Sequence, residues 1–125
     1  MGLNRSRPNG EGGVNGLNRL ERLGWTVLAE RHLSLTPGES RVLAHLTLDR
    51  PDGVCTYDCL AGHLNLQDGT ASVARRRLPT RIARIRRALR DLGLPSSSVQ
   101  NVSEVGYRIG ADSARRIRGL VEAAA

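Results

Sequence analysis

The chain has 125 residues, a length typical of one compact domain, and a formal net charge of +7 at neutral pH. All 19 basic residues are arginine, the only aromatic residues are Trp25, Tyr57 and Tyr107, and no run approaches the ~20 apolar residues that span a bilayer. The N-terminus also lacks the apolar core of a secretory signal peptide. We therefore expect a cytoplasmic protein with a core built from Leu, Val, Ile and Ala.

The N-terminal third of the chain gives weak structural signals. Residues 1–15 combine Gly, Asn, Arg and Pro with almost nothing to bury, which predicts a disordered arm. An apolar rhythm over residues 17–23 predicts one or two helical turns ended by Gly24. The β-prone residues 25–28 and the segment 32–35 then predict a small antiparallel hairpin, which would give the domain short N-terminal β elements.

A strong helix start follows. Thr36 precedes Pro37 and lies three residues before Glu39, a pattern that predicts a helix N-terminus closed by a capping box. Apolar residues at helical spacing continue this first helix, and the Pro- and Gly-containing residues 49–53 predict the turn that ends it.

Two further helices are predicted in the middle of the chain. Thr56 is a candidate N-cap for a short helix through Leu64, and the polar residues 65–72 predict a loop. The helix that follows, over residues 78–92, is the most regular, because its apolar residues recur at spacings of four and three: Leu78, Ile82, Ile85, Leu89 and Leu92.

The last part of the chain predicts a hairpin and one more helix. Residues 99–102 and 105–109 are β-like runs joined by a short polar turn. Residues 112–125 predict a helix capped by Asp112 or Ser113, with an apolar stripe at Ile117, Leu120 and Val121. A helix this short is marginal in water, so the stripe is expected to pack either on its own domain or on the same helix of a second subunit.

The positive charge is concentrated in one segment. Eight arginines lie between positions 75 and 90 with no acidic residue among them, while the remaining eleven arginines face twelve acidic residues. Such a patch is expected of a protein that binds a polyanion. Projected at about 100° per residue, the predicted helix places Thr80, Arg84 and Arg87 opposite its apolar seam. An ordinary solvated face is the alternative, but such faces mix both signs of charge, and here no acidic residue is available before Asp91.

The order of these elements predicts a fold class. Three helices followed by a β-hairpin form a winged helix-turn-helix, here with a longer connection between the second and third helices than the tightest version has. We predict an α+β fold with a three-helix core, short N-terminal β elements, a C-terminal hairpin as the wing, and an extra C-terminal helix. Residues 1–15 would form the arm, residues 16–110 the DNA-binding domain and residues 111–125 the additional helix.

Four segments in order also carry a family resemblance. They are LTPGE at 35–39, GVCTYDCL at 53–60, RIARIRRAL at 81–89 and VQNVSEVGYRI at 99–109, the last with a diagnostic Gly-Tyr-Arg. With them, residues 33–110 resemble the DNA-binding output domain of bacterial response regulators of the OmpR/PhoB type. The resemblance implies a sequence-specific transcriptional regulator of double-stranded DNA, with the helix at 78–92 in the major groove and the hairpin at 99–109 as the wing. We expect the domain to stand alone, without the receiver domain of those regulators.

The resemblance and the helical projection together give a set of predicted DNA-binding residues: Arg75, Arg76, Arg77, Thr80, Arg81, Arg84, Arg86, Arg87, Asn101, Ser103, Tyr107 and Arg108. The sequence departs from the family at two places. Pro79 replaces an acidic residue, which predicts a helix start near Leu78 and leaves residues 75–77 in a loop as phosphate ligands. In the wing, Ser103 and Glu104 replace the usual Arg-Gly, adding a carboxylate that repels DNA.

No catalytic or metal-binding constellation is evident in the sequence. His32, His45 and His63 are scattered, and the acidic residues are dispersed. Cys55 and Cys59 lack both the second half of a zinc site and the spacing of a redox motif, so they are expected to be small apolar fillers in a reducing compartment. We expect no enzyme activity, no cofactor and no metal.

Two other binding functions compete with DNA binding. RNA recognition usually needs surface aromatic residues, and this chain has only three aromatics. A winged helix that contacts RNA polymerase or a partner regulator, through residues 65–72 and the C-terminal helix, would not require an unpaired arginine face. The candidate partners are therefore double-stranded DNA, RNA polymerase and a second copy of the chain, in the cytoplasm at the nucleoid and with no membrane contact.

Overall fold

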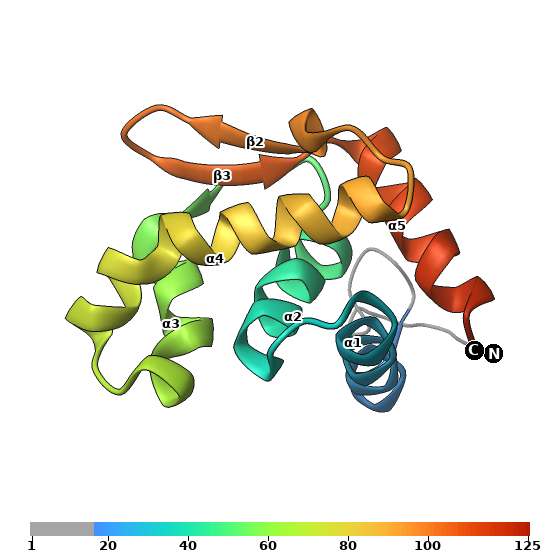
Figure 1. Ribbon diagram of the computed structural model, residues 1–125, viewed down its shortest axis with the longest axis horizontal. Coiled ribbons are helices and arrows are strands. Elements are labelled where there is room, and N and C mark those ends of the chain that lie inside the picture. Colours follow the sequence, from blue (N-terminus) through green and yellow to red (C-terminus); the bar gives the residue numbers. More distant parts are fainter. Residues whose placement is uncertain (1–16) are drawn as a thin grey trace, which may run out of the picture.

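The computed structural model describes residues 17–125, and the predicted arm at residues 1–15 lies outside them. The described chain has an α+β fold of five α-helices and one small antiparallel sheet (Figure 1). In chain order the elements are α1 (Arg19–Leu33), α2 (Pro37–Ala44), the π-helical turn η2 (His45–Asp49), β1 (Cys55–Thr56), α3 (Tyr57–Asp68), α4 (Ala71–Asp91), the 3₁₀ turn η3 (Ser96–Ser98), β2 (Val99–Val102), β3 (Gly106–Ile109) and α5 (Ala111–Ala123).

Helix α1 corrects the prediction for the N-terminal third of the domain. One continuous helix replaces the expected short helix and hairpin, and no strand precedes β1 between residue 17 and Cys55. Trp25, Ala29 and Leu33 recur every four residues and are all buried, so helical burial outweighs the β propensity of residues 25–28. Gly24 lies on the exposed side, where nothing approaches its Cβ position, and does not end the helix.

Two of the three predicted N-caps are confirmed. Thr36 accepts a hydrogen bond from the Glu39 amide, and the Glu39 carboxylate accepts one from the Thr36 amide, which closes the capping box. Thr56 caps α3 through the Cys59 amide. Helix α3, however, continues through Asp68, so the predicted loop at residues 65–72 is wrong.

Helix α4 begins about two turns earlier than predicted. Only Gly69 and Thr70 separate it from α3, and the Thr70 hydroxyl caps it by accepting from the Val73 amide. Ala74 extends the buried seam one turn towards the N-terminus, which favours this earlier start over one at Leu78. Pro79 therefore lies inside the helix, on its exposed side, where it removes one backbone hydrogen bond. The apolar seam is confirmed: Leu78, Ile82, Ile85 and Leu89 are fully buried.

The predicted hairpin is also confirmed, and it recruits a third strand. The sheet order is β1–β3–β2, with Cys55 opposite Tyr107 and Val99 opposite Ile109. A Cβ on Gly106 would lie only 1.8 Å from the carbonyl oxygen of Cys55, so glycine is required for β1 to approach β3. The wing-like hairpin is thereby anchored to the body of the domain.

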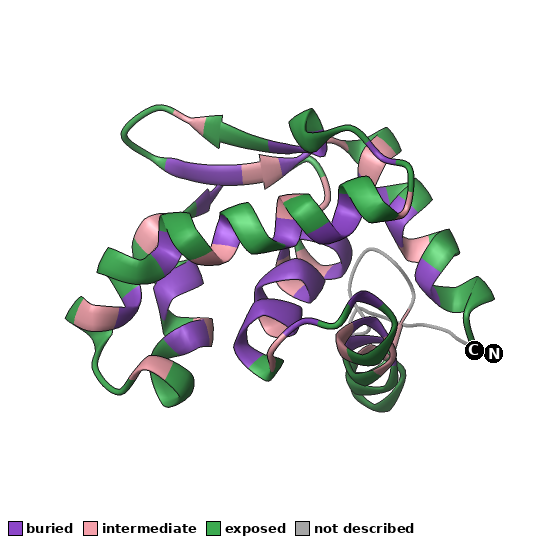
Figure 2. Cartoon of the chain, in the orientation of Figure 1, coloured by how far each residue is buried: buried purple, intermediate pink, exposed green. Residues whose placement is uncertain are grey.

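Helix α5 packs onto its own domain. Its residues Ala114, Ile117 and Val121 are buried in the common core, beside η2 and α1 (Figures 1 and 2). Leu120 stays 38% exposed, so only part of the predicted stripe is buried. Its cap also differs from the prediction: the N-cap is Gly110, which has no side chain to offer. Between residues 17 and 125, no helix is long and apolar enough to cross a membrane.

Candidate nucleic-acid interface

The candidate interface is the solvent-facing side of α4. Figure 1 shows α4 running across the molecule with the β2–β3 hairpin along one flank and α2 and α3 on the other. Taking about 100° per residue, Arg76, Arg87 and Arg90 lie roughly 160°, 180° and 120° from the buried Leu78. All three are exposed, and their side chains form no hydrogen bond or ion pair among residues 17–125. Arg76 and Arg87 are three turns, about 16 Å, apart along the helix axis.

Other arginines of α4 are engaged with acidic residues from α2 and α3. Arg81 donates to Glu39 at 3.0 Å and to Asp68 at 2.8 Å, and Arg84 donates its Nε to the same Glu39 oxygen at 2.8 Å. Arg77 lies 3.7 Å from Asp68. Both carboxylate side chains are 0% exposed.

Arg75 is engaged in the same way, since it pairs with the exposed Asp58 at 2.6 Å. The absence of acidic residues within the segment itself therefore does not mean that its arginines lack partners. The prediction of unpaired arginines was wrong on this point, because these partners come from positions 9 to 45 residues away in the chain.

Arg81 consequently serves the fold. The hydrogen bond to Asp68 raises the pKa of Arg81 above its ordinary value. Burial opposes this rise, and the hydrogen bond to Glu39 adds a smaller one. Its guanidinium is only 17% exposed and connects α4 to both α2 and α3. Arg84 differs, because its side chain is 51% exposed and only its Nε is bound, so its terminal nitrogens face solvent in a fixed orientation.

Arg86 connects α4 to the hairpin. It donates from Nε and Nη2 to the carbonyl oxygen of Val99, at 3.1 and 2.9 Å, and its guanidinium lies 5.9 Å from the centre of the Tyr107 ring. Tyr107 is 6% exposed and packs edge-on against Tyr57. Burial raises the pKa of Tyr107. These two predicted DNA-binding residues therefore hold the hairpin in place and do not form part of the exposed surface.

The hairpin itself presents polar groups. Asn101 and Ser103 are exposed, and the Tyr57 hydroxyl donates to the Asn101 side-chain oxygen at 3.2 Å. Arg108 is oriented by Gln100, which accepts from its Nε at 2.7 Å. Glu104 is exposed in the turn with a φ of 63°.

The structure thus divides the predicted set. Arg76, Thr80, Arg84 and Arg87 are exposed on α4, and Asn101 and Ser103 are exposed on the hairpin. Arg90 belongs with the exposed group, although the prediction did not include it as a site residue. Its position near the outward side of the helical projection was the signal that could have identified it. Residues 75–77 lie within α4 and not in a loop.

No protein-family model, curated protein or solved structure matches this chain.

Proposed function

We propose that the chain binds double-stranded DNA as a winged helix-turn-helix protein and acts as a transcriptional regulator. Three features of the fold support this proposal. Helices α2, α3 and α4 follow one another, α3 and α4 are joined by two residues, and the β2–β3 hairpin follows α4 and is anchored by β1. This is the element order of winged helix-turn-helix domains, including the OmpR/PhoB-type output domain.

The observation that carries the proposal is the row of unpartnered guanidinium groups at Arg76, Arg87 and Arg90. Four other arginines of the helix have acidic partners within the fold, yet these three project from its solvent side without one. Repulsion between like charges destabilises the neighbouring pair Arg87 and Arg90, which lie three residues apart, and a phosphate backbone relieves it. The helix has 21 residues and is about 31 Å long, so it can lie in a major groove about 12 Å wide and still reach phosphates beyond its edges.

Each part of the surface receives a separate role in this proposal. Arg84 and Arg87 are the candidates for base contacts, because a guanidinium can bind guanine O6 and N7 with two hydrogen bonds. Arg76 and Arg90, towards the two ends of the row, are the candidates for phosphate contacts. Asn101 and Ser103, on the hairpin, would contact the neighbouring phosphate backbone of the DNA. The Glu104 carboxylate, at the turn of the hairpin, would be held away from that backbone.

The test is a salt titration of binding to duplex DNA by fluorescence anisotropy. A monomer that contacts ~5 phosphates should give a slope of log K against log salt of about −4 to −5. The variant Arg76→Gln/Arg87→Gln/Arg90→Gln should bind at least tenfold more weakly, and its slope should be smaller in magnitude by up to about 3.

The matched control is Arg19→Gln/Arg31→Gln/Arg116→Gln, which removes the same charge at exposed arginines of α1 and α5. Its slope should stay close to that of the parent protein. Equal losses in the two triple variants would show that binding follows net charge and not the α4 surface. No binding to any duplex at low salt would reject the proposal.

A second candidate function is a protein-interaction module, contacting RNA polymerase or a partner regulator. The observation in its favour is an apolar row on α1, where Leu20, Leu23 and Val27 are 78%, 57% and 41% exposed at helical spacing. Leu20→Glu/Leu23→Glu separates the two functions, since it should abolish a protein contact and leave binding to naked DNA unchanged.

A further inference from the structure

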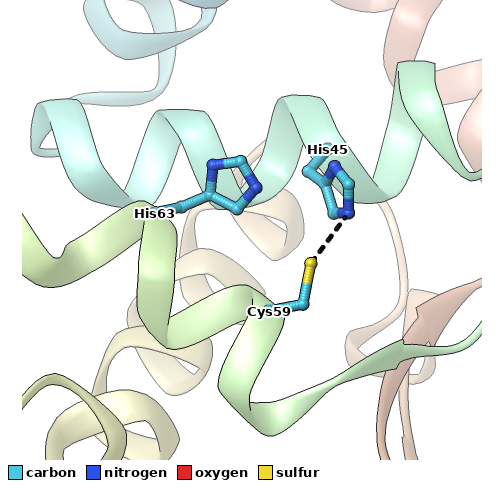
Figure 3. Close-up of side chains that lie close together, drawn as sticks. All are labelled: His45, Cys59 and His63. Atoms are coloured by element: carbon cyan, nitrogen blue, oxygen red, sulfur yellow. Dashed lines mark hydrogen bonds between the residues drawn. The ribbon is translucent and has the colours of Figure 1, made fainter. Parts of the chain in front are cut away.

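Three metal-ligating side chains meet on the surface between α2 and α3. His45 comes from η2, and Cys59 and His63 come from α3 (Figure 3). The Cys59 Sγ lies 3.4 Å from the His45 Nε2, and the two imidazole rings are 4.7 Å apart between their centres. One ligand atom from each residue lies within 4.8 Å of the other two. Cys59 is exposed, and both histidines are partly buried.

The fold creates this meeting from residues that are separated in sequence. Cys59 and His63 are four residues apart, so they share one face of α3. His45 opens the π-helical turn at the end of α2, and turns of this kind are frequent at functional sites. Arg41 fixes the two helices together by donating from Nε and Nη2 to the carbonyl oxygen of His63, at 3.1 and 2.8 Å. Cys55, in contrast, is buried in β1; its thiol also interacts with His45, but it is not one of the three clustered ligand residues.

His45 is oriented as a metal ligand usually is. Its Nδ1 lies 3.0 Å from the Asp49 carboxylate, which leaves the Nε2 directed at Cys59. Arg22 in turn holds Asp49 through two hydrogen bonds of 2.7 and 2.6 Å. Burial alone would raise the pKa of Asp49, but the hydrogen bonds from His45 and Arg22 lower it to about 2. A carboxylate behind the imidazole is the arrangement that fixes ring orientation in zinc sites.

We propose that His45, Cys59 and His63 bind a divalent transition-metal ion, with Zn²⁺ as the preferred ion. One thiolate and two imidazoles form a donor set suited to zinc, and hard cations such as Mg²⁺ prefer oxygen. Tetrahedral bonds of 2.0–2.3 Å place ligand atoms about 3.3–3.8 Å apart. The Cys59 and His45 atoms already lie at this separation, and no pair of the three is wider than 4.8 Å. The three residues leave the fourth position to water or to a ligand supplied by another molecule.

The charges around the site set its expected affinity. Arg22 and Arg41 oppose a cation, while the Cys59 thiolate and the Asp49 carboxylate favour it. Burial lowers the pKa of His63 to about 4, so this ligand is neutral at physiological pH. The hydrogen bond to Asp49 raises the pKa of His45 to about 10. Metal ions bind the deprotonated forms of thiol and imidazole, so binding should weaken as the pH falls.

Cobalt titration of the reduced full-length chain, without an affinity tag, tests the proposal. Binding of Co²⁺ should produce a thiolate-to-metal charge-transfer band and visible bands of tetrahedral intensity, saturating at one ion per chain and disappearing when Zn²⁺ is added. Cys59→Ser should abolish the charge-transfer band, and His63→Gln should weaken binding at least tenfold. Asp49→Asn should weaken it by about 10–100-fold, as expected for a positioning residue behind a ligand.

Two control variants remove the same residue types elsewhere. Cys55→Ala removes the other thiol of the chain, and His32→Gln removes the third histidine, which is exposed on α1. Both should keep the parent stoichiometry and spectrum, and circular dichroism should confirm that all the variants are folded. The proposal is overturned if no charge-transfer band appears, or if the band survives Cys59→Ser. It is also overturned if iodoacetamide alkylates Cys59 faster than a free thiol and saturating Zn²⁺ gives no protection, because Cys59 is then an activated thiol and not a ligand.

Discussion

Removing Arg81 should destabilise the fold much more than removing its neighbour Arg84. Arg81 pairs with two carboxylates that are 0% exposed, Glu39 and Asp68, and is the nearer of the two partners of Asp68. Breaking a buried ion pair by deleting one side costs about 3–5 kcal/mol, because the remaining charge stays buried without compensation. Glu39 keeps Arg84 at 2.8 Å, and Asp68 keeps only the more distant Arg77 at 3.7 Å. We therefore expect Arg81→Ala to cost about 3 kcal/mol, the lower end of that range.

Arg84→Ala is the matched comparison. Its side chain is 51% exposed and Glu39 keeps Arg81, so solvent screening should limit the loss to about 0–1 kcal/mol. Guanidinium chloride unfolding can be followed through the fluorescence of the single, buried Trp25. At roughly 4 °C per kcal/mol for a domain of this size, Arg81→Ala should lower the Tm by about 12 °C. Similar losses in both variants, or a loss below about 1 kcal/mol for Arg81→Ala, would refute the assignment of Arg81 to the fold.

Three further predictions concern packing and backbone. Ile117→Ala should cost about 2–5 kcal/mol, because the side chain is buried inside its own domain. The sedimentation coefficient should stay unchanged. Dissociation of a dimer in this variant would instead place Ile117 at a subunit interface. Pro79→Ala should stabilise α4 by up to about 3 kcal/mol, because alanine is the better helix former. About 1 kcal/mol of this gain is lost, since alanine leaves the unfolded chain with more conformational entropy than proline does. A lower Tm would contradict a helix that continues through this position. Gly106→Ala should cost about 1–3 kcal/mol in thermal unfolding, because the added Cβ forces β1 away from β3. The control is Gly62→Ala, which has open space at its Cβ position and should stabilise α3 by about 0.5–1 kcal/mol in the same assay.

The elements that could be predicted from the sequence are those specified by local signals. Thr36 and Thr56 cap helices through residues three positions away, and the seam of α4 is defined by spacing alone. Only the first turns of helix α1 were predicted. Its continuation past Gly24 was missed, because the β-prone residues around Trp25 contain a helical burial pattern that depends on α2 and α5 being present to cover it.

The candidate site was predictable only in part, for the same reason. The sequence places arginines on the outward side of α4, but it does not reveal that Glu39 and Asp68 are buried beneath Arg81. The cluster of His45, Cys59 and His63 was missed because it requires η2 to lie against α3. Both features depend on tertiary contacts between elements, which the spacing of residues along one element does not reveal.

The division of arginines along α4 has a consequence for how this protein can evolve. Arg81 and Arg86 fix the helix to the body and to the hairpin. The side chains of Arg76, Ala83 and Arg87 are exposed and form no hydrogen bond or ion pair with the rest of the described fold. Selection can therefore change the outward positions one at a time without a loss of stability. A gene duplicate could acquire a different binding preference by substitutions there alone, and its descendants would retain the inward arginines and their acidic partners.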